Sequence, residues 1–267
     1  MVKKPVTNND SQALVSWDEQ LAAMAGISAG MENNIGGQFF SVKGGILTWN
    51  DMPLPDNQMF VVILDAIIEN VYYEGTFDAT QPQSPLCFAF GRDETKLTPH
   101  KVVVDAKTAQ CDVCARCAHN EWGSANIGRG KACRNTRRLA MIAAGRWVPE
   151  TKHFELLAKE DFEHTTVGFL KLPVTSVKGY STFVKQVAAV LKRPPFTIVT
   201  KVRVIPDAKS QFKVTFEPVM NLPEELLPVM IRRNKETAAI IEFPYALIDV
   251  EEKPARPQPK GRGARKY

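Results

Sequence analysis

The sequence predicts a mainly β domain of the α+β class. Short segments rich in valine, isoleucine, phenylalanine and tyrosine recur between turn residues, as in strands joined by short loops. Two late segments alternate apolar and polar side chains with a period of two, the pattern of a half-buried strand. Five or more such strands with a few flanking helices are typical of a small OB-like barrel, and a β-sandwich with a similar strand count is the alternative.

Composition divides the 267-residue chain into three parts. Residues 1–35 are a polar arm whose amphipathic patch, Trp17, Leu21 and Met24, predicts one short helix. Residues 36–250 hold the OB-like core, and residues 251–267 are rich in Pro, Lys, Arg and Gly and are expected to be a disordered basic tail. We find no apolar run near the ~20 residues of a membrane helix and no secretory signal, so we expect a cytoplasmic protein without a membrane partner.

Seven strands are expected in the core. In chain order they are residues 46–49, 59–69, 70–77, 85–90, 169–174, 196–204 and 211–219. The polar link at 206–210 predicts that the last two pair as a hairpin. In the strand 196–204, Lys201 and Arg203 point to the side opposite the apolar residues.

Three helices are expected beside these strands. The first, residues 134–144, would end at Gly145 and carry Arg134, Arg137 and Arg138 in its first turn. The others are residues 181–193, stopped by two prolines, and residues 222–236. The apolar stretch 238–250 is expected to add a last strand or to pack on the core.

The core is interrupted by a cysteine-rich insertion, residues 105–147. Four of the five cysteines follow the pattern Cys111-x2-Cys114-x2-Cys117-x15-Cys133. Two sulfurs on one turn and a distant partner make a tetrahedral site that suits zinc, and these four residues are the predicted ligands. Without a signal for an oxidising compartment, disulfides are disfavoured.

Two questions stay open at this metal site. The same spacing occurs in iron–sulfur proteins, although the arginine-rich surroundings and the absence of a proline after Cys133 favour zinc. His119 and Cys87 are alternatives to Cys111 as the fourth ligand. Cys87 lies in an expected strand, where packing as an apolar side chain is the commoner role.

Positive charge gathers in two places. The formal net charge is +5, residues 111–147 contain seven basic and two acidic residues, and residues 253–267 contain six basic residues and no acid. Two basic islands on an otherwise acidic body indicate a polyanionic partner.

Binding an unpaired nucleic-acid strand requires cations for phosphates and aromatic faces for bases. The candidate phosphate contacts are Arg129, Lys131, Arg134, Arg137, Arg138, Lys201 and Arg203. The candidate stacking residues are Trp122, Tyr72 and Tyr73, with Trp49 a further one. Trp122 stands out because its loop is polar and flanked by glycine.

The sequence does not predict an enzyme. The four histidines are scattered, and we find no zinc-protease, phosphate-loop or nucleophile-elbow motif. His119-Asn-Glu121 follows the cysteines and lacks the proline of the deaminase signature.

Several motifs occur together in the residues 35–220. They are Gly44-Gly45, Tyr72-Tyr73, Pro85-x-Cys87-Phe88-Ala89 and Cys114-x2-Cys117-x4-Trp122-Gly123-Ser124 running to Gly128-x-Gly130-Lys131-Ala132-Cys133-Arg134. In these motifs the chain resembles a family of single-stranded DNA-binding proteins of tailed bacteriophages and prophages. The family's design is similar to that of the T-even phage protein, an OB-fold with a zinc-bearing subdomain.

The resemblance implies sequence-independent binding of single-stranded DNA in phage DNA replication and recombination, in the host cytoplasm. Replication and recombination proteins are then candidate partners, and RNA stays open as a second ligand. The basic C-terminus contrasts with the acidic recruiting tail usual in such proteins, so we expect it to touch nucleic acid directly. The competing hypotheses are a zinc-stapled structural or assembly protein and an iron–sulfur protein.

Overall fold

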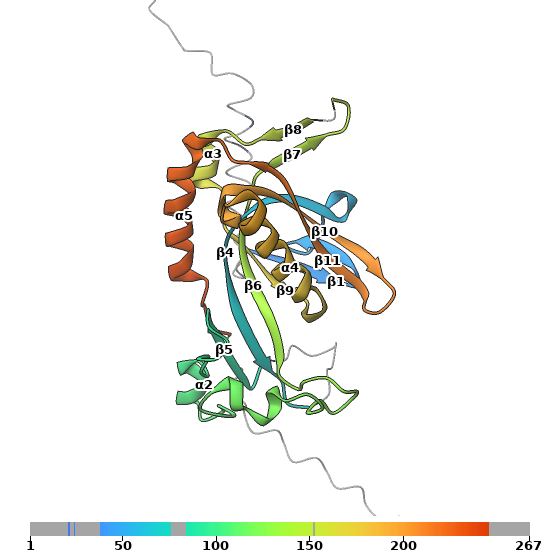
Figure 1. The fold of residues 1–267 in the computed structure, drawn as a ribbon, viewed down its shortest axis with the longest axis vertical. Helices are drawn as coiled ribbons and strands as arrows, with labels where there is room; N and C mark the ends of the chain where they lie inside the picture. The colour runs from blue at the N-terminus through green and yellow to red at the C-terminus, as the bar shows by residue number, and fades with distance from the viewer. Residues whose placement is uncertain (1–20, 22–23, 25–37, 76–83, 152, 246–267) are drawn as a thin grey trace, which may run out of the picture. The chain divides into compact units, whose positions relative to one another are not determined.

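The computed structural model describes residues 38–75, 84–151 and 153–245, together with Leu21 and Met24. One sheet carries nine strands in the order β11-β10-β4-β6-β9-β1-β2-β3, with β5 pairing to β4. This sheet curls into a half-barrel flanked by helices, which confirms the predicted mainly β, α+β class (Figure 1). The basic tail and nearly all of the N-terminal arm lie outside the described residues.

The longest strand, β4 (Gln58–Tyr72), organises the sheet. Its first residues pair with β10 (Ile198–Asp207), its last with β5 (Cys87–Gly91), and its other edge pairs with β6 (Arg134–Ala143). The sequence predicts two strands here, 59–69 and 70–77, but the polar pair between them is no turn. Glu69 and Asn70 are both buried, and each bonds to a side chain of β6, so the strand continues through them.

The predicted helix at 134–144 is wrong, because these residues form strand β6. Both edges of β6 are paired, one with β4 and the other with β9 (Gly168–Leu172). Its run Leu139–Ile142 is buried on both faces, and such a short apolar run fits a central strand as well as a helix. Gly145 therefore ends no helix: it opens β7 (Gly145–Val148), where a Cβ would lie 2.0 Å from the Glu155 carbonyl oxygen.

The edges of the sheet are two antiparallel units. The hairpin of β10 and β11 (Gln211–Asn221) is confirmed in the predicted place. At the other edge lie three short strands: β1 (Phe39–Lys43), β2 (Ile46–Trp49) and β3 (Met52–Pro53). A separate two-stranded ribbon, β7 with β8 (His153–Leu156), was not predicted from the sequence.

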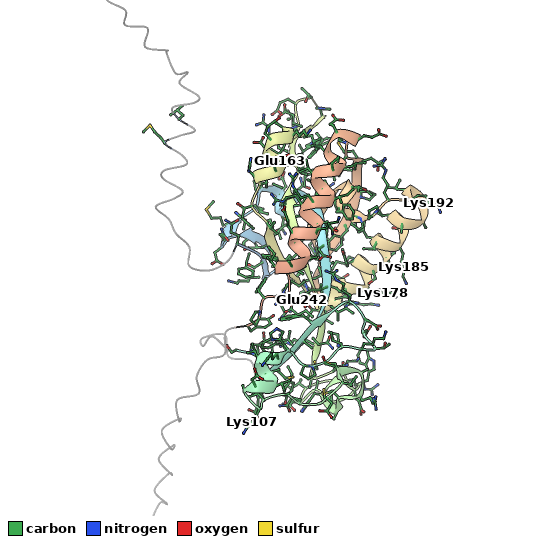
Figure 2. All side chains as sticks on the ribbon, turned by 90° about the vertical axis from the view of Figure 1, so that its left-hand side faces the viewer. Lys107, Glu163, Lys178, Lys185, Lys192 and Glu242 are labelled. Carbon is green, nitrogen blue, oxygen red and sulfur yellow. The ribbon has the colours of Figure 1, made fainter. Side chains whose placement is uncertain are left out.

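Helix α4 (Val174–Gln186) packs on one face of the curled sheet. A π-helical turn, Val187–Leu191, continues it, so the helix predicted at 181–193 is confirmed with an earlier start. Lys178, Lys185 and Lys192 line one side of this helix and its continuation, away from the sheet (Figure 2).

The opposite face of the sheet is covered by α5 (Leu227–Ile240) and α3 (Lys159–His164). Pro228 lies in the first turn of α5, where a missing N–H costs nothing. The stretch 238–250 was expected to add a strand or to pack on the core. Residues 238–240 end this helix, Ile241 is buried in an apolar cluster, and residues 246–250 lie outside the described part. Because neighbouring residues of β4 point to opposite faces, Val61 and Ile63 enter the α4 core while Val62 and Leu64 enter the α5 core.

Beyond helices α4 and α5, the strands β4, β5 and β6 extend to the segment that contains helix α2 (Figure 1). The connection between β5 and β6, residues 92–133, contains helix α2 (Lys101–Asp105). Five short 3-10 turns complete the fold: Pro55–Asn57, Cys114–Arg116, Ala118–Asn120, Pro195–Thr197 and Glu224–Leu226. The last third of the predicted insertion, 134–147, belongs mainly to β6 and β7.

Candidate nucleic-acid interface and cysteine cluster

All five cysteines gather around one small cavity at the end of β4 and β5. The cavity has a volume of about 20 Å³ and is lined by the five cysteines and by His119. Four of these cysteines are 6–9% exposed, namely Cys87, Cys114, Cys117 and Cys133, whereas Cys111 is half-buried. All five are free of disulfides. The folded chain therefore brings the core-strand Cys87 to the same place as the four predicted ligands.

Backbone hydrogen bonds hold this cluster together. The Cys114 N–H donates to the Leu97 carbonyl at 2.8 Å, and the Cys133 N–H donates to the His119 carbonyl at 2.7 Å. The Asn120 side chain donates to the Cys114 carbonyl at 2.8 Å. The basic return limb of the loop is thereby pinned beside the knuckle.

The chemistry of the cluster suits a thiolate-binding metal, although no three His, Cys, Asp or Glu side chains within the described residues are arranged as metal ligands. Burial raises the pKa of Cys114 to about 11 and that of Cys133 to about 12, with further increases from neighbouring cysteines. Thiols with such high pKa values are protonated at neutral pH, whereas a metal ion binds the thiolate form. Beside the cluster, the buried Asn70 Nδ2 lies near the Cys114 sulfur, whose thiolate form it favours, and it has no other hydrogen-bond partner among the described residues. Cysteine sulfur and histidine nitrogen are the ligand types that structural zinc sites use.

Trp122 is the most open of the predicted stacking residues. Its side chain is 81% exposed, so it is not a core residue. The Lys131 ammonium lies 5.7 Å from the centroid of its ring and also donates to Asn120 Oδ1 at 3.1 Å. Arg129, in the same loop, is exposed. This loop thus presents an aromatic face together with two cations.

Tyr73, directly after β4, forms a second combination of ring and cations. The Arg134 guanidinium lies 5.5 Å and the Lys171 ammonium 5.7 Å from its ring centroid. The ring is half-buried, and burial raises the pKa of the Tyr73 hydroxyl. Tyr72 points the other way: its ring stacks on His119 at 4.1 Å and lines the cysteine cavity, so it belongs to that cluster.

Arg138 lies in the interior, where it cannot reach a phosphate. Its side chain is 4% exposed and pairs with the fully buried Glu69 at 2.9 Å. It also donates to the carbonyls of Ile241 and Phe243 at 3.0 and 2.7 Å, and its guanidinium lies 3.9 Å from the Phe243 ring centroid. The guanidinium is thus held within the fold by a carboxylate, two backbone carbonyls and an aromatic ring.

Arg137 is separated from the other two arginines by the pleat of β6. A helix would have placed all three in one turn, whereas a strand puts Arg134 and Arg138 on one face and Arg137 on the other. Arg137 donates to the Thr136 carbonyl at 3.0 Å and lines a cavity next to Tyr180 of α4. Of the three predicted contacts on β6, Arg134 is the exposed one that accompanies an aromatic ring.

Lys201 and Arg203 lie at the far end of β4 from the cysteines. In the register of β10, Lys201 faces Phe60 and Arg203 faces Gln58, the first residue of β4. Lys201 pairs with Glu217 at 3.4 Å, and Arg203 is exposed with no carboxylate partner in the described part of the chain. The predicted cations thus divide into two groups at opposite ends of one strand.

Sequence reasoning missed Lys171, which joins the group around Tyr73. Its ammonium lies 3.3 Å from Glu69 and donates to the Tyr245 hydroxyl at 2.8 Å, and Tyr245 in turn donates to Glu69. Burial lowers the pKa of Lys171. The alternation of its strand, Phe169 and Lys171 on one side, was the available signal.

No family model, curated protein or solved structure matches this chain. Within the residues that the structure describes, none of the helices has the length and apolar character required to cross a bilayer.

Proposed function

We propose that this protein binds single-stranded DNA without regard to sequence. The observation that carries the proposal is the pairing of surface rings with cations: Trp122 with Lys131, and Tyr73 with Arg134 and Lys171. Sequence-tolerant binding combines stacking on aromatic rings with a cationic path for the backbone, and both occur here side by side.

In this mechanism, Trp122 and Tyr73 stack against unpaired bases while neighbouring cations hold phosphates. Arg129, Lys131 and Arg134 supply the positive charges that contact the phosphates. Stacking uses the faces of the bases and leaves their edges unread, which makes binding indifferent to sequence. Arg138 forms an ion pair with Glu69 in the interior, and Glu69 also pairs with Lys171. Arg138 thereby helps to position Lys171 at this surface.

The proposal includes a structural zinc ion in the cysteine cluster. The ligands come from Cys111, Cys114, Cys117 and Cys133, with Cys87 and His119 as the alternatives that line the same cavity. Zinc would supply the missing positive charge and couple folding of the loop to metal binding. The loop that carries Trp122 and Lys131 lies between these ligands, so its order would depend on the ion.

In this proposal the curled sheet is an OB-like barrel, and the protein protects single strands during phage DNA replication and recombination in the host cytoplasm. Support comes from the resemblance of the motifs around the cysteines to those of phage single-stranded DNA-binding proteins. RNA and replication or recombination proteins are further candidate partners. The proposed role is that of a binding protein without catalytic activity.

The test is a fluorescence-anisotropy titration with labelled poly-dT, repeated with duplex DNA and at several salt concentrations, beside metal analysis of the same sample. We expect single strands to be preferred, with a log–log salt slope of about −0.7 for each phosphate contacted. Stable self-association without binding would favour the zinc-stapled assembly protein. A brown sample that bleaches on reduction would favour the iron–sulfur protein.

A further inference from the structure

A groove with aromatic walls lies at the end of the sheet remote from the cysteines. It has a volume of about 680 Å³ and is bordered by β1, β2, the start of β4, β7 and the link between α3 and β9. The residues that matter for its chemistry are Phe40, Trp49, Phe60, Trp147, Gln38 and Gln58. Figure 2 shows Glu163 of α3 and Lys107, which follows α2, near opposite ends of the described core. The groove lies toward the Glu163 end, and the cysteines lie toward the Lys107 end.

Two tryptophans form the walls of this groove. Trp49 packs against Phe40 with ring centroids 4.3 Å apart, and both rings rest on Gly168, where a Cβ would approach each to 2.4 Å. Trp147 projects from the β7–β8 ribbon and is 43% exposed. Trp147 and Phe60 also line an adjoining hollow of about 300 Å³ that contains Lys201. Trp147 therefore lines both the groove and the adjoining hollow.

The groove also offers an unused hydrogen-bond acceptor. Gln38 Oε1 is buried and has no hydrogen-bond partner in the described residues. A buried acceptor left without a donor is costly, so such an atom points to a ligand that brings an N–H group. Gln58 adds a second amide to the same lining.

Two cations lie near the groove: Lys201 lines the adjoining hollow, and Arg203 lies two residues farther along β10. Arg203 faces Gln58 and Lys201 faces Phe60 across neighbouring strands, so all four side chains project from the same face of the sheet. The Lys201–Glu217 pair leaves Glu217 69% exposed, and such surface pairs are weak and easily exchanged. A flat ring, an N–H donor and a nearby anionic group together describe a nucleotide.

We propose that this groove is a second base-binding site for the same single strand, with a base stacked on Trp147 and phosphates on Lys201 and Arg203. The inference rests on the proposed function and extends it to the length of strand engaged. β4 has 15 residues, and at about 3.3 Å per residue its ends are about 46 Å apart along the strand. An oligonucleotide of about 5 nucleotides, near the lower end of single-strand site sizes, reaches one site, whereas a long one reaches both.

The experiment compares full-length wild type, Trp147→Ala and Trp147→Phe in anisotropy titrations with long and short oligo-dT. Trp147→Ala should weaken binding of the long strand about 5- to 150-fold, the usual range for one stacked base, and Trp147→Phe should restore most of it. Val190→Ala is the matched control, because Val190 is an exposed apolar residue (76%) on the π-helical turn. Wild-type affinity in Trp147→Ala would overturn the inference while leaving the proposed function intact. If the wild-type protein binds no single-stranded DNA, both this inference and the proposed function are wrong.

Crosslinking of wild type covers the case in which Trp147→Ala fails to fold. Long oligonucleotides carrying 5-bromouracil are irradiated with the protein, and the modified peptides are identified by mass spectrometry. We expect adducts on Trp147 or Trp49 in addition to those on Trp122 or Tyr73. Adducts confined to Trp122 and Tyr73 would exclude the groove as a base site, and would leave an aromatic peptide as its occupant.

Discussion

Arg134 and Arg138 lie on the same face of β6, four residues apart, and have opposite roles. Arg134 is exposed beside Tyr73, whereas Arg138 is enclosed by Glu69, two backbone carbonyls and the rings of Phe90 and Phe243. Residue type does not separate them, because both are arginines in one basic cluster. Burial separates the two arginines, because the buried Arg138 stabilises the fold through its ion pair and is not accessible to a ligand.

Replacing Arg138 should therefore damage stability. In Arg138→Ala, Glu69 keeps a buried charge without its main partner, and we expect the free energy of unfolding to fall by about 3–5 kcal/mol. Urea unfolding followed by circular dichroism measures the loss. Arg134→Ala is the control and should change stability by less than about 0.5 kcal/mol. Equal stability of the two variants would show that Arg138 is not the interior ion-pair partner.

A second prediction at this scale concerns the fourth metal ligand. Zinc takes four ligands in structural sites, and the Cys111 thiol lies in hydrogen-bonding contact with the thiols of Cys114 and Cys117. We therefore expect Cys111→Ser to lower bound zinc as much as Cys114→Ser does, and Cys87→Ser to retain it. Elemental analysis of the purified variants gives the metal content. The reverse result for Cys87 and Cys111 would make Cys87 the fourth ligand.

At the scale of elements, the strand geometry of β6 decides which cations act together. Its pleat directs Arg134 toward Tyr73 and Arg137 toward the side of α4. Lys171 of the neighbouring strand β9 joins Arg134, since Arg138 and Lys171 are paired in register on that face. The proposed interface is thus assembled from three strands and one loop.

Arg129→Ala combined with Arg134→Ala should weaken single-strand binding and flatten its salt dependence. Each lost phosphate contact should reduce the magnitude of the log–log salt slope by about 0.7. Anisotropy titrations at several salt concentrations measure it. Arg137→Ala, which removes one positive charge from the other face of β6, is the control and should keep the wild-type slope. A similar loss in the control would mean that net charge, and not position, governs binding.

Close packing at Gly168 supports the edge strands β1 and β2. A side chain there would collide with Phe40 and Trp49, so Gly168→Val should destabilise the protein by about 1–3 kcal/mol. Gly179→Ala, in the middle of α4 with the nearest atom at 3.9 Å, should instead stabilise it by about 0.5–1 kcal/mol. Thermal unfolding of the two variants compares them, and stability equal to wild type in Gly168→Val would contradict the packing.

At the scale of the whole molecule, two large cores lie under α4 and α5, and the cysteines lie beyond both. The apolar clusters at the cysteine end are small: Ile68, Ala89, Leu97 and Cys114 form one, and Val71, Cys87, Phe88 and Val103 form another. A region with so little buried apolar surface opens at low free-energy cost unless something else secures it. In our proposal, the bound metal ion stabilises this region.

Removing the metal should therefore loosen one end of the protein selectively. After chelation we expect faster amide hydrogen exchange in residues 111–133, with unchanged protection in β4 residues 59–64 and in α4, because those belong to the large cores. Hydrogen-exchange mass spectrometry with and without chelator resolves these peptides. Uniform loss of protection would show that the cysteine cluster stabilises the entire fold.

Local pattern was sufficient for the fold class and for several elements. Alternation over 196–204 and 211–219, with a polar link between them, predicted the β10–β11 hairpin, and the apolar side and proline stop near 194 predicted α4. These signals depend on neighbours in sequence, which is why they can be read without a structure. The exposed position expected for Trp122, in a polar loop with little apolar surface to cover it, was confirmed in the same way.

The remaining features depend on residues far apart in the sequence. Leu139–Ile142 became a central strand because β4 and β9 lie on either side of it, and Glu69 became buried because Arg138 and Lys171 come from other strands. Cys87 reached the other cysteines only through the pairing of β5 with β4. The sequence by itself determined the β class, the hairpin, α4 and the residue types available for metal and nucleic acid. Tertiary structure alone decided which of those side chains meet and which stay open to solvent, because pairing and burial arise from long-range contacts.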